Sequence, residues 1–185
     1  MVYILLGEGF EEAEALVTAD VLRRAELPVC LAGIGGGMVT GSHNIVVKSD
    51  KAVEGITLSA GDMVVLPGGM GGVASIENSQ TAMALARQAR EDPALWLAAI
   101  CAAPTLLARA GLLGSGVHAV CYPGMEDELS AAGAVPQMDR PVVAEGSLIT
   151  GRGPGAAFDF GLALVEALAG AETAEQIRAG LHYGS

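Results

Sequence analysis

The sequence predicts an α/β protein built on a mainly parallel sheet with helices on both faces. Short continuous apolar runs, typical of fully buried strands, alternate along the chain with longer segments whose apolar residues have helical spacing. Glycine accounts for 26 of the 185 residues and charged residues for only 17%, as in a compact protein with many tight turns. No repeat, linker or low-complexity tract interrupts this pattern, so residues 1–185 are expected to form one domain.

Strands are predicted where short runs rich in Val, Ile and Leu are followed by glycine, proline or cysteine. These runs cover residues 2–6, 29–32, 62–66, 95–100 and 117–121. Residues 38–49, which contain a Gly-Ser-His-Asn sequence, are predicted to form a hairpin or an irregular pair of strands. Residues 141–150 are predicted to form a hairpin that turns at Glu145-Gly146.

Helices are predicted where apolar residues recur every three or four positions. These segments are residues 10–25, 79–90, 105–110, 125–132, 154–169 and 172–181. The first has acidic residues in its opening turn and Arg23 and Arg24 in its last turn, as the helix dipole favours. Pro154 stands at the first position of the long helix, where proline is well tolerated. Because helices alternate with buried strands, a ligand site is expected beyond the carboxyl ends of the strands.

The charge of the chain restricts its partners. A formal net charge of −11 argues against binding to nucleic acid or to an anionic membrane surface. The N-terminus lacks the basic segment of a signal peptide, and the longest uncharged apolar stretch, residues 95–108, is too short to span a bilayer. We therefore expect a cytoplasmic protein.

Cys101 is the most informative of the three cysteines. Their odd number and spacing predict neither a disulfide framework nor a metal site. Cys101 ends the apolar run 95–100 and precedes a helix, whose N-terminal N–H groups favour a nucleophilic thiolate. A buried structural thiol fits the same pattern, so both interpretations stay open here. Cys30 lies within a strand and is expected to be inert, while the role of Cys121, at the end of another strand, stays open.

A carboxylate at the start of the first helix is the best candidate partner for Cys101. Glu11 and Glu12 are expected to face solvent and complement the helix dipole. Glu14 has the apolar neighbours Phe10 and Val17 at helical spacing, which leaves inward and outward orientations equally open. A buried glutamate has a raised pKa and can carry a proton near neutral pH. No motif links Cys101 to any of the three histidines, His43, His118 and His182.

Two glycine-rich segments follow predicted strands. Residues 67–72 are expected to be either a flexible turn or a set of backbone N–H groups directed at an oxyanion. Residues 151–155 precede a helix but match neither the dinucleotide-binding nor the P-loop spacing. Arg152 in the second segment is a candidate contact for an anion.

Together, four segments at matching spacing resemble the ThiJ/PfpI family, and within it the subgroup of the Parkinson-disease-associated protein and its bacterial relatives. The resemblance extends from Val2 to about Leu181. The segments are Gly9-Phe10-Glu11-Glu12-Ala13-Glu14, Leu66-Pro67-Gly68-Gly69, Ala98-Ala99-Ile100-Cys101-Ala102-Ala103-Pro104, and Gly153-Pro154-Gly155 with Phe158-Asp159-Phe160-Gly161.

The resemblance implies a flavodoxin-like sandwich that forms a homodimer. It implies that Cys101 is the nucleophile of a strand-to-helix elbow and that a mostly protonated Glu14 hydrogen-bonds its sulfur. The resemblance also implies further site residues. Backbone N–H groups of Gly68, Gly69 and Ala102 would bind an oxyanion. Tyr122 would lie near the substrate pocket, and Arg24 and Arg152 near the substrate pocket or the dimer seam.

The residues and the resemblance together predict a cysteine-dependent enzyme that acts on reactive carbonyls such as methylglyoxal, glyoxal or glycated molecules, with no cofactor or metal. The alternative is a redox-sensing protein or chaperone in which Cys101 is oxidised to a sulfinate stabilised by Glu14. A thiazole-phosphate biosynthetic protein and a cysteine peptidase are weaker alternatives. Many relatives carry a histidine where this chain has Tyr122, which counts against a cysteine–histidine mechanism.

Overall fold

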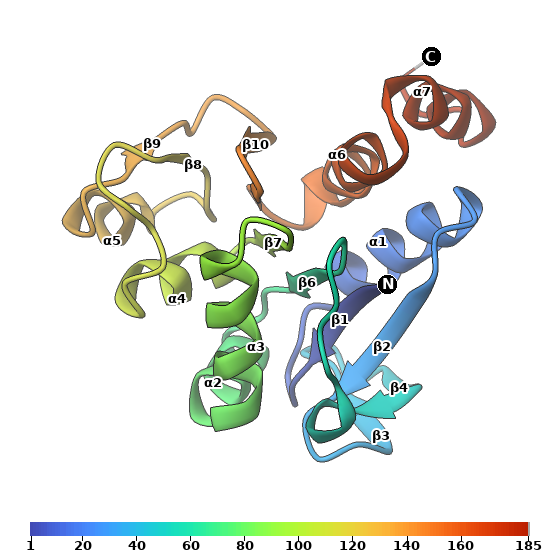
Figure 1. Cartoon of the computed structure of the whole chain (residues 1–185), viewed down its shortest axis with the longest axis horizontal. Coiled ribbons are helices and arrows are strands. Elements are labelled where there is room, and N and C mark those ends of the chain that lie inside the picture. Colours follow the sequence, from blue (N-terminus) through green and yellow to red (C-terminus); the bar gives the residue numbers. More distant parts are fainter. Residues whose placement is uncertain (185) are drawn as a thin grey trace.

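The computed structural model describes residues 1–184 and places a seven-stranded sheet at the centre of the molecule (Figure 1). The five longer parallel strands have the order β2-β1-β6-β7-β11, which is the 2-1-3-4-5 order of flavodoxin-like folds. The predicted α/β fold is thus confirmed. The strands of this sheet are β1 (Val2–Leu6), β2 (Val29–Gly33), β5 (Lys51–Ala52), β6 (Met63–Leu66), β7 (Trp96–Ile100), β10 (Val142–Glu145) and β11 (Leu148–Gly151).

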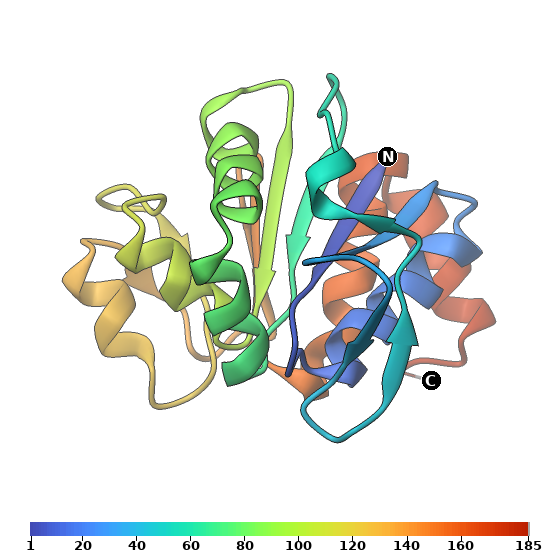
Figure 2. The same ribbon diagram turned by 90° about the horizontal axis from the view of Figure 1, so that it is seen from below.

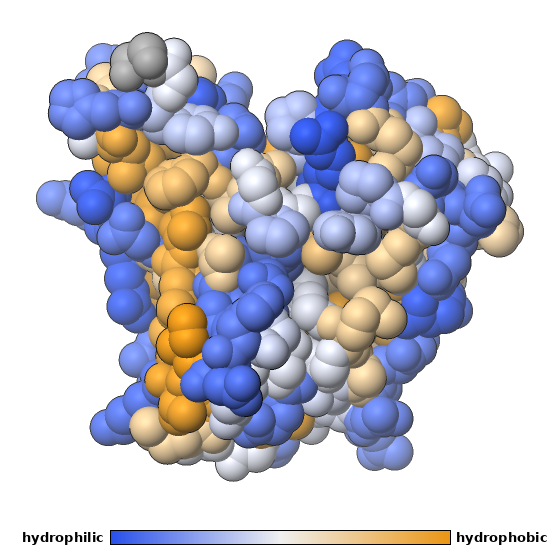
Figure 3. Space-filling view, turned by 180° about the vertical axis from the view of Figure 1, so that it is seen from behind, coloured by the Kyte–Doolittle hydropathy of each residue, from blue (hydrophilic) through white to orange (hydrophobic). Residues whose placement is uncertain are grey.

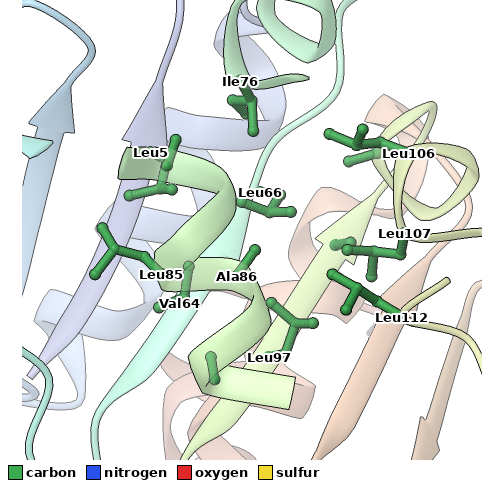
Figure 4. Packing of buried hydrophobic residues seen from close by; sticks show 14 of the residues in the cluster. Leu5, Val64, Leu66, Ile76, Leu85, Ala86, Leu97, Leu106, Leu107 and Leu112 are labelled. Atoms are coloured by element: carbon green, nitrogen blue, oxygen red, sulfur yellow. The ribbon is translucent and has the colours of Figure 1, made fainter. Parts of the chain in front are cut away.

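Helices cover both faces of this sheet (Figure 2). Side chains alternate between the two faces along each strand, so that Leu5 belongs to one hydrophobic cluster and Ile4 to the other. Leu66 and Leu97 pack against Ala86 and its helical neighbours on the first face (Figure 4). The helices are α1 (Glu12–Arg24), α2 (Met70–Asn78), α3 (Gln80–Glu91), α4 (Ala103–Arg109), α5 (Glu126–Ala131), α6 (Ala157–Ala169) and α7 (Ala171–Gly180), with short 3₁₀ turns η1 (Val53–Gly55) and η2 (Pro154–Ala156).

Both predicted hairpins are present. Strands β3 (Met38–Thr40) and β4 (Val46–Lys48) pair antiparallel outside the central sheet, and β10 pairs antiparallel with β11 at its edge. The strand predicted at residues 117–121 is much shorter: β8 (His118–Ala119) pairs only with β9 (Val135–Pro136). It stays outside the central sheet because β11 occupies the place beside β7.

Helix α2 was not among the predicted helices because its first turn contains glycines, which are poor helix formers. The structure shows why they are there. A Cβ on Gly72 would stand 2.6 Å from the Cα of Phe10, and one on Gly71 would stand 3.1 Å from the carbonyl oxygen of Glu8. The glycines therefore let α2 approach the segment after β1, and Gly69 adopts a positive φ of 83° that glycine takes without strain.

The chain segments after β1, β6 and β7 meet at the carboxyl edge of the sheet, where the sequence predicts the ligand site. The carbonyl oxygen of Gly68, which follows β6, accepts a hydrogen bond from Glu11 N at 2.9 Å. Within residues 1–184, no helix is long and apolar enough to cross a membrane.

Candidate active site

Cys101 stands at the turn between β7 and α4, as the sequence predicts. Its φ of +67° is unusual for a residue other than glycine and is the strained backbone of a nucleophile elbow. Two backbone hydrogen bonds hold this conformation: Cys101 N–H donates to Gly151 O at 2.9 Å, and Tyr122 N–H donates to Cys101 O at 2.8 Å. The side chain is 8% exposed and is directed to the carboxyl edge of the sheet.

Glu14 faces inward, which settles the orientation that helical spacing left open. The residue is 1% exposed, and its Oε2 accepts a hydrogen bond from Gly68 N–H at 2.7 Å. Its Oε1 is buried without a hydrogen-bond partner among the described residues. A Cβ on Gly68 would stand 2.6 Å from both Glu14 Oε2 and Cys101 Cβ. Only glycine therefore fits between the carboxyl group and the thiol.

Burial dominates the electrostatics of this pair. Burial raises the pKa of Glu14 to about 7, against the hydrogen bonds from the Cys101 thiol and Gly68 N–H, and the charge of Glu11 adds to the rise. Burial followed by the charge of Glu14 raises the pKa of the Cys101 thiol to about 12, although the N–H groups of Ala102 and Gly69 oppose this shift. The helix N-terminus was expected to favour the thiolate, but burial has the larger effect and favours the thiol.

Protonation of Glu14 changes this balance. A neutral carboxylic acid no longer repels a thiolate, and its O–H can donate a hydrogen bond to the sulfur. A pKa of about 7 gives Glu14 its proton for a large fraction of the time near neutral pH. The thiolate is therefore formed most easily in the state in which Glu14 carries the pair's remaining proton.

Two of the three backbone N–H groups expected to act near the Cys101 sulfur do so, and the third does not. The N–H groups of Gly69 and Ala102 act on Cys101, as expected for oxyanion donors. Gly68 was expected to be a third donor, but its N–H is already bound to Glu14. Gly68 is instead the spacer and hydrogen-bond donor that holds the acid.

An open pocket of about 980 Å³ lies in front of Cys101. Tyr122 lines it, in agreement with the prediction. The lining residues are Gly9, Glu11, Ser42, His43, Gly69, Met70, Gly71, Cys101, Ala102, Tyr122, Pro123, Gly124, Met125 and Pro154. No arginine or lysine is found among these described lining residues.

The two predicted arginines are not part of this lining, and their place near the pocket or a dimer seam stays a prediction. Arg24 lies about 15 Å along α1 from Glu14, and its Nε forms an ion pair with Asp20 at 2.8 Å. Arg152 directs Nη1 to the carbonyl oxygen of Met138 at 3.5 Å. Its side chain therefore contacts the loop that contains Met138.

The sequence did not predict that the loop of residues 41–45 contributes Ser42 and His43 to the pocket lining. Glu12, expected to face solvent, is 4% exposed and accepts four hydrogen bonds from this loop. Its Oε1 accepts from His43 N–H (2.7 Å) and Ile45 N–H (3.3 Å), and its Oε2 from Ser42 Oγ (3.1 Å) and His43 Nδ1 (3.0 Å). No sequence signal links Glu12 to a loop about thirty residues away.

Glu11, Glu12 and His43 form the group in residues 1–184 with metal-ligand character, since their candidate ligand atoms lie within 4.8 Å of one another. Both Glu12 oxygens, however, already accept two hydrogen bonds each. A metal ion would have to displace the bonds that hold the loop, so we assign no metal to this group.

The other two cysteines stay apart from this chemistry. Cys121 is completely buried, and burial raises the pKa of its thiol to about 12. Cys30 is also buried, and burial raises its pKa as well. Neither lines the pocket in front of Cys101.

Comparisons with known proteins agree with this architecture. Protein dj-1beta of Drosophila melanogaster is 40% identical over 179 residues, covering 96% of this chain and 94% of that protein. The glutathione-independent glyoxalase DJR-1.2 of Caenorhabditis elegans is 32% identical over 169 residues, covering 91% and 88%.

Solved structures show the same likeness. The crystal structure of Drosophila melanogaster DJ-1beta gives a TM-score of 0.91 at 37% identity, covering 100% of this chain and 98% of that one. Oxidized Toxoplasma gondii DJ-1 gives a TM-score of 0.90 at 31% identity, with the same coverage. A family model described as the DJ-1/PfpI family matches residues 1–167. Because this match contains the strand-to-helix elbow and the helix that brings the buried acid to it, the chain belongs to the DJ-1/PfpI family.

Proposed function

We propose that the chain is a cofactor-independent enzyme that converts small reactive carbonyls, such as methylglyoxal and glyoxal, to hydroxy acids. The observation that carries this proposal is the buried Glu14 carboxyl beside the Cys101 thiol, with Gly68 as the spacer. A nucleophile and a group that exchanges protons near neutral pH are the two parts that such a reaction needs. The relative described as a glutathione-independent glyoxalase supports the same activity.

The proposed reaction with methylglyoxal begins when the Cys101 thiolate adds to the aldehyde carbon. The aldehyde oxygen, near the N–H groups of Gly69 and Ala102, takes the proton of Glu14 and gives a hemithioacetal. The Glu14 carboxylate then removes the proton of that carbon and returns it to the neighbouring carbon, which leaves a lactoyl thioester. Water cleaves the thioester to lactate and restores the thiol. One water is consumed and no electrons leave the system.

The residues that line the pocket favour an uncharged substrate. Its described lining has no arginine or lysine and includes the apolar side chains Met70, Met125 and Pro123. A phosphate group would find no arginine or lysine there, and the ring of His43 already faces the carboxylates of Glu11 and Glu12. The thiazole-phosphate alternative therefore has no support from the site, and glycated molecules are supported only where the carbonyl end is neutral.

A direct test compares wild type, Cys101→Ser and Glu14→Gln for lactate formation from methylglyoxal. The proposal expects lactate from wild type, none above background from Cys101→Ser, and strongly reduced formation from Glu14→Gln. Equal lactate formation by wild type and Cys101→Ser would show that the thiol is not the nucleophile. Far-UV circular dichroism checks that all three proteins are folded.

A redox role is the second candidate, because a protonated Glu14 can donate a hydrogen bond to an oxidised sulfur. A thiolate oxidised by two molecules of peroxide gives a sulfinate and two waters. Mass spectrometry after mild peroxide treatment tests this role. A two-oxygen adduct confined to Cys101 supports it, and its absence or its spread over all three cysteines counts against it.

We also propose that the chain forms a homodimer. A strip of hydrophobic residues runs down the left side of the molecule in Figure 3. Met38, Ile45 and Val46 of the β3–β4 hairpin are exposed large apolar side chains. Light scattering of the purified chain tests the proposal, and a monomeric mass at micromolar concentration would contradict it.

A further inference from the structure

His43 and Glu12 form a second hydrogen-bonded pair of titratable side chains at the Cys101 pocket. His43 Nδ1 lies 3.0 Å from Glu12 Oε2 and 3.0 Å from Ser42 Oγ. Because the ionised Glu12 carboxylate can only accept hydrogen bonds, Nδ1 carries a proton and the free ring nitrogen is Nε2. The side chain of His43 is 68% exposed, and it lines the same pocket as Cys101.

We infer that His43 Nε2 is a catalytic proton donor to the second oxygen of a dicarbonyl substrate held on Cys101, and that Glu12 is its positioning residue. This inference rests on the proposed function and assigns a group to a step that Glu14 alone leaves unsupported. When Glu14 removes the proton of the attacked carbon, negative charge develops on the oxygen of the neighbouring carbonyl. A donor at that oxygen lowers the barrier.

Each proton in this step has a source and a destination. The carbon–hydrogen electron pair forms the new carbon–carbon double bond, and the carbonyl oxygen takes the proton of His43 Nε2, which gives an enediol. Glu14 then returns its proton to the second carbon. The hydroxyl proton on the first carbon goes back to His43 Nε2, and the lactoyl thioester results.

The surroundings of His43 favour the form that donates. Two carboxylates of α1 face the ring: Glu12 Oε2 at 3.0 Å and Glu11 Oε1 at 3.6 Å from Nδ1. The loop itself contributes only the neutral Ser42 hydroxyl. The hydrogen bond to Glu12, followed by the charges of Glu11 and Glu12, raises the pKa of His43, so the imidazolium persists to higher pH.

The chain contains a matched control for this pair. His118 Nδ1 lies 2.7 Å from Glu145 Oε2, and His118 N–H donates to the same oxygen, as His43 N–H donates to Glu12. The ring of His118 is about half exposed. The His118–Glu145 pair therefore resembles the His43–Glu12 pair in its hydrogen bonds, but it does not line the Cys101 pocket.

The test measures kcat/KM for methylglyoxal against pH in wild type, His43→Gln, Glu12→Gln and His118→Gln. We expect His43→Gln to lower kcat/KM about 10²-fold. The variant should also lack the fall in rate that wild type shows when His43 deprotonates as the pH rises. Glu12→Gln should move that fall to lower pH, because a neutral amide stabilises the imidazolium less. His118→Gln should match wild type. Alkylation of Cys101 by iodoacetamide should proceed equally in wild type and His43→Gln.

The outcomes separate this inference from the function on which it rests. A wild-type rate and an unchanged pH profile in His43→Gln would overturn the role of His43 while leaving the Cys101–Glu14 mechanism standing. An equal loss in His118→Gln would also overturn it, because the effect would then be independent of the pocket. No turnover by wild type would overturn both proposals.

Discussion

Glu12 and Glu14 stand two residues apart on the first turns of α1 and have opposite chemistry. Both are buried, at 4% and 1% exposure. Burial alone would raise both pKa values, yet bonds from His43, the backbone and Ile45 lower the pKa of Glu12 to about 2, whereas the pKa of Glu14 rises to about 7. Glu12 accepts four hydrogen bonds from residues 42–45, whereas Glu14 accepts one backbone hydrogen bond, from Gly68, and lies beside the Cys101 thiol.

The difference shows that burial decides the pKa of Glu14, whereas at Glu12 the hydrogen-bond donors together outweigh burial. Glu12 is permanently ionised near neutral pH and acts as an anchor for the loop that forms one wall of the pocket. Glu14 has one oxygen without a partner beside a thiol, so it can exchange a proton.

The largest effect is expected from Cys101→Ser. Removing the nucleophile should lower kcat/KM for methylglyoxal by about 10⁴-fold or more, because a serine hydroxyl has no comparable tendency to ionise beside Glu14. Lactate formation measures this loss. The surroundings of Glu12 should stay unchanged, which the NMR shift of the His43 ring checks.

Glu14→Gln should give the next largest loss, about 10²- to 10⁴-fold in kcat. The amide can still accept the hydrogen bond from Gly68 N–H but cannot carry the proton between carbons. KM should change little, since the pocket lining does not include Glu14. If Glu14→Gln kept the wild-type kcat, Glu14 would not be the group that transfers the proton, and its role would be structural.

Stability against pH should move in opposite directions for the two carboxyl groups. Between pH 4.5 and about 7 the native state holds a proton on Glu14 that the unfolded chain has lost, so rising pH destabilises the fold, by up to about 3 kcal/mol. Glu12 has a lowered pKa, so its contribution is present above pH 4.5 and is lost as the pH falls toward about 2.

Urea unfolding of wild type, Glu14→Gln and Glu12→Gln over this range separates the two contributions. Glu14→Gln should flatten the fall in unfolding free energy between pH 4.5 and 7. Glu12→Gln should flatten the loss below pH 4.5. If both variants kept the wild-type profile, the opposite pKa shifts of the two groups would be wrong.

Gly68→Ala should give the smallest of these effects on the fold, a destabilisation of about 1–3 kcal/mol. The added methyl group would press on Glu14 Oε2 and Cys101 Cβ, both 2.6 Å from its ideal position. Thermal unfolding measures this destabilisation. The ultraviolet absorption of the Cys101 thiolate, followed against pH, should show that protonation of Glu14 affects the ionisation of the thiol differently in the variant. Gly146→Ala is a control with open space around the Cβ, although its φ of +60° adds backbone strain.

Most of the fold could be predicted from local pattern. Buried strands and amphipathic helices are visible as apolar runs and helical spacing, and they led to the correct sheet type. The strand at residues 117–121 was overestimated, because the choice between edge positions depends on which strand pairs with β7. Helix α2 was not predicted because glycine has a low helix propensity. Its glycines are instead required for close packing against Phe10.

The candidate site divides in the same way. The sequence by itself determined the turn at Cys101 and, through the family motif, singled out Glu14, because both are encoded within short segments. Only the tertiary structure decided that Glu14 faces inward, that Gly68 donates to it, and that Glu12 brings His43 to the pocket. These last contacts join residues about thirty to fifty positions apart, and the free energy of such a contact depends on donors and burial that no local spacing records.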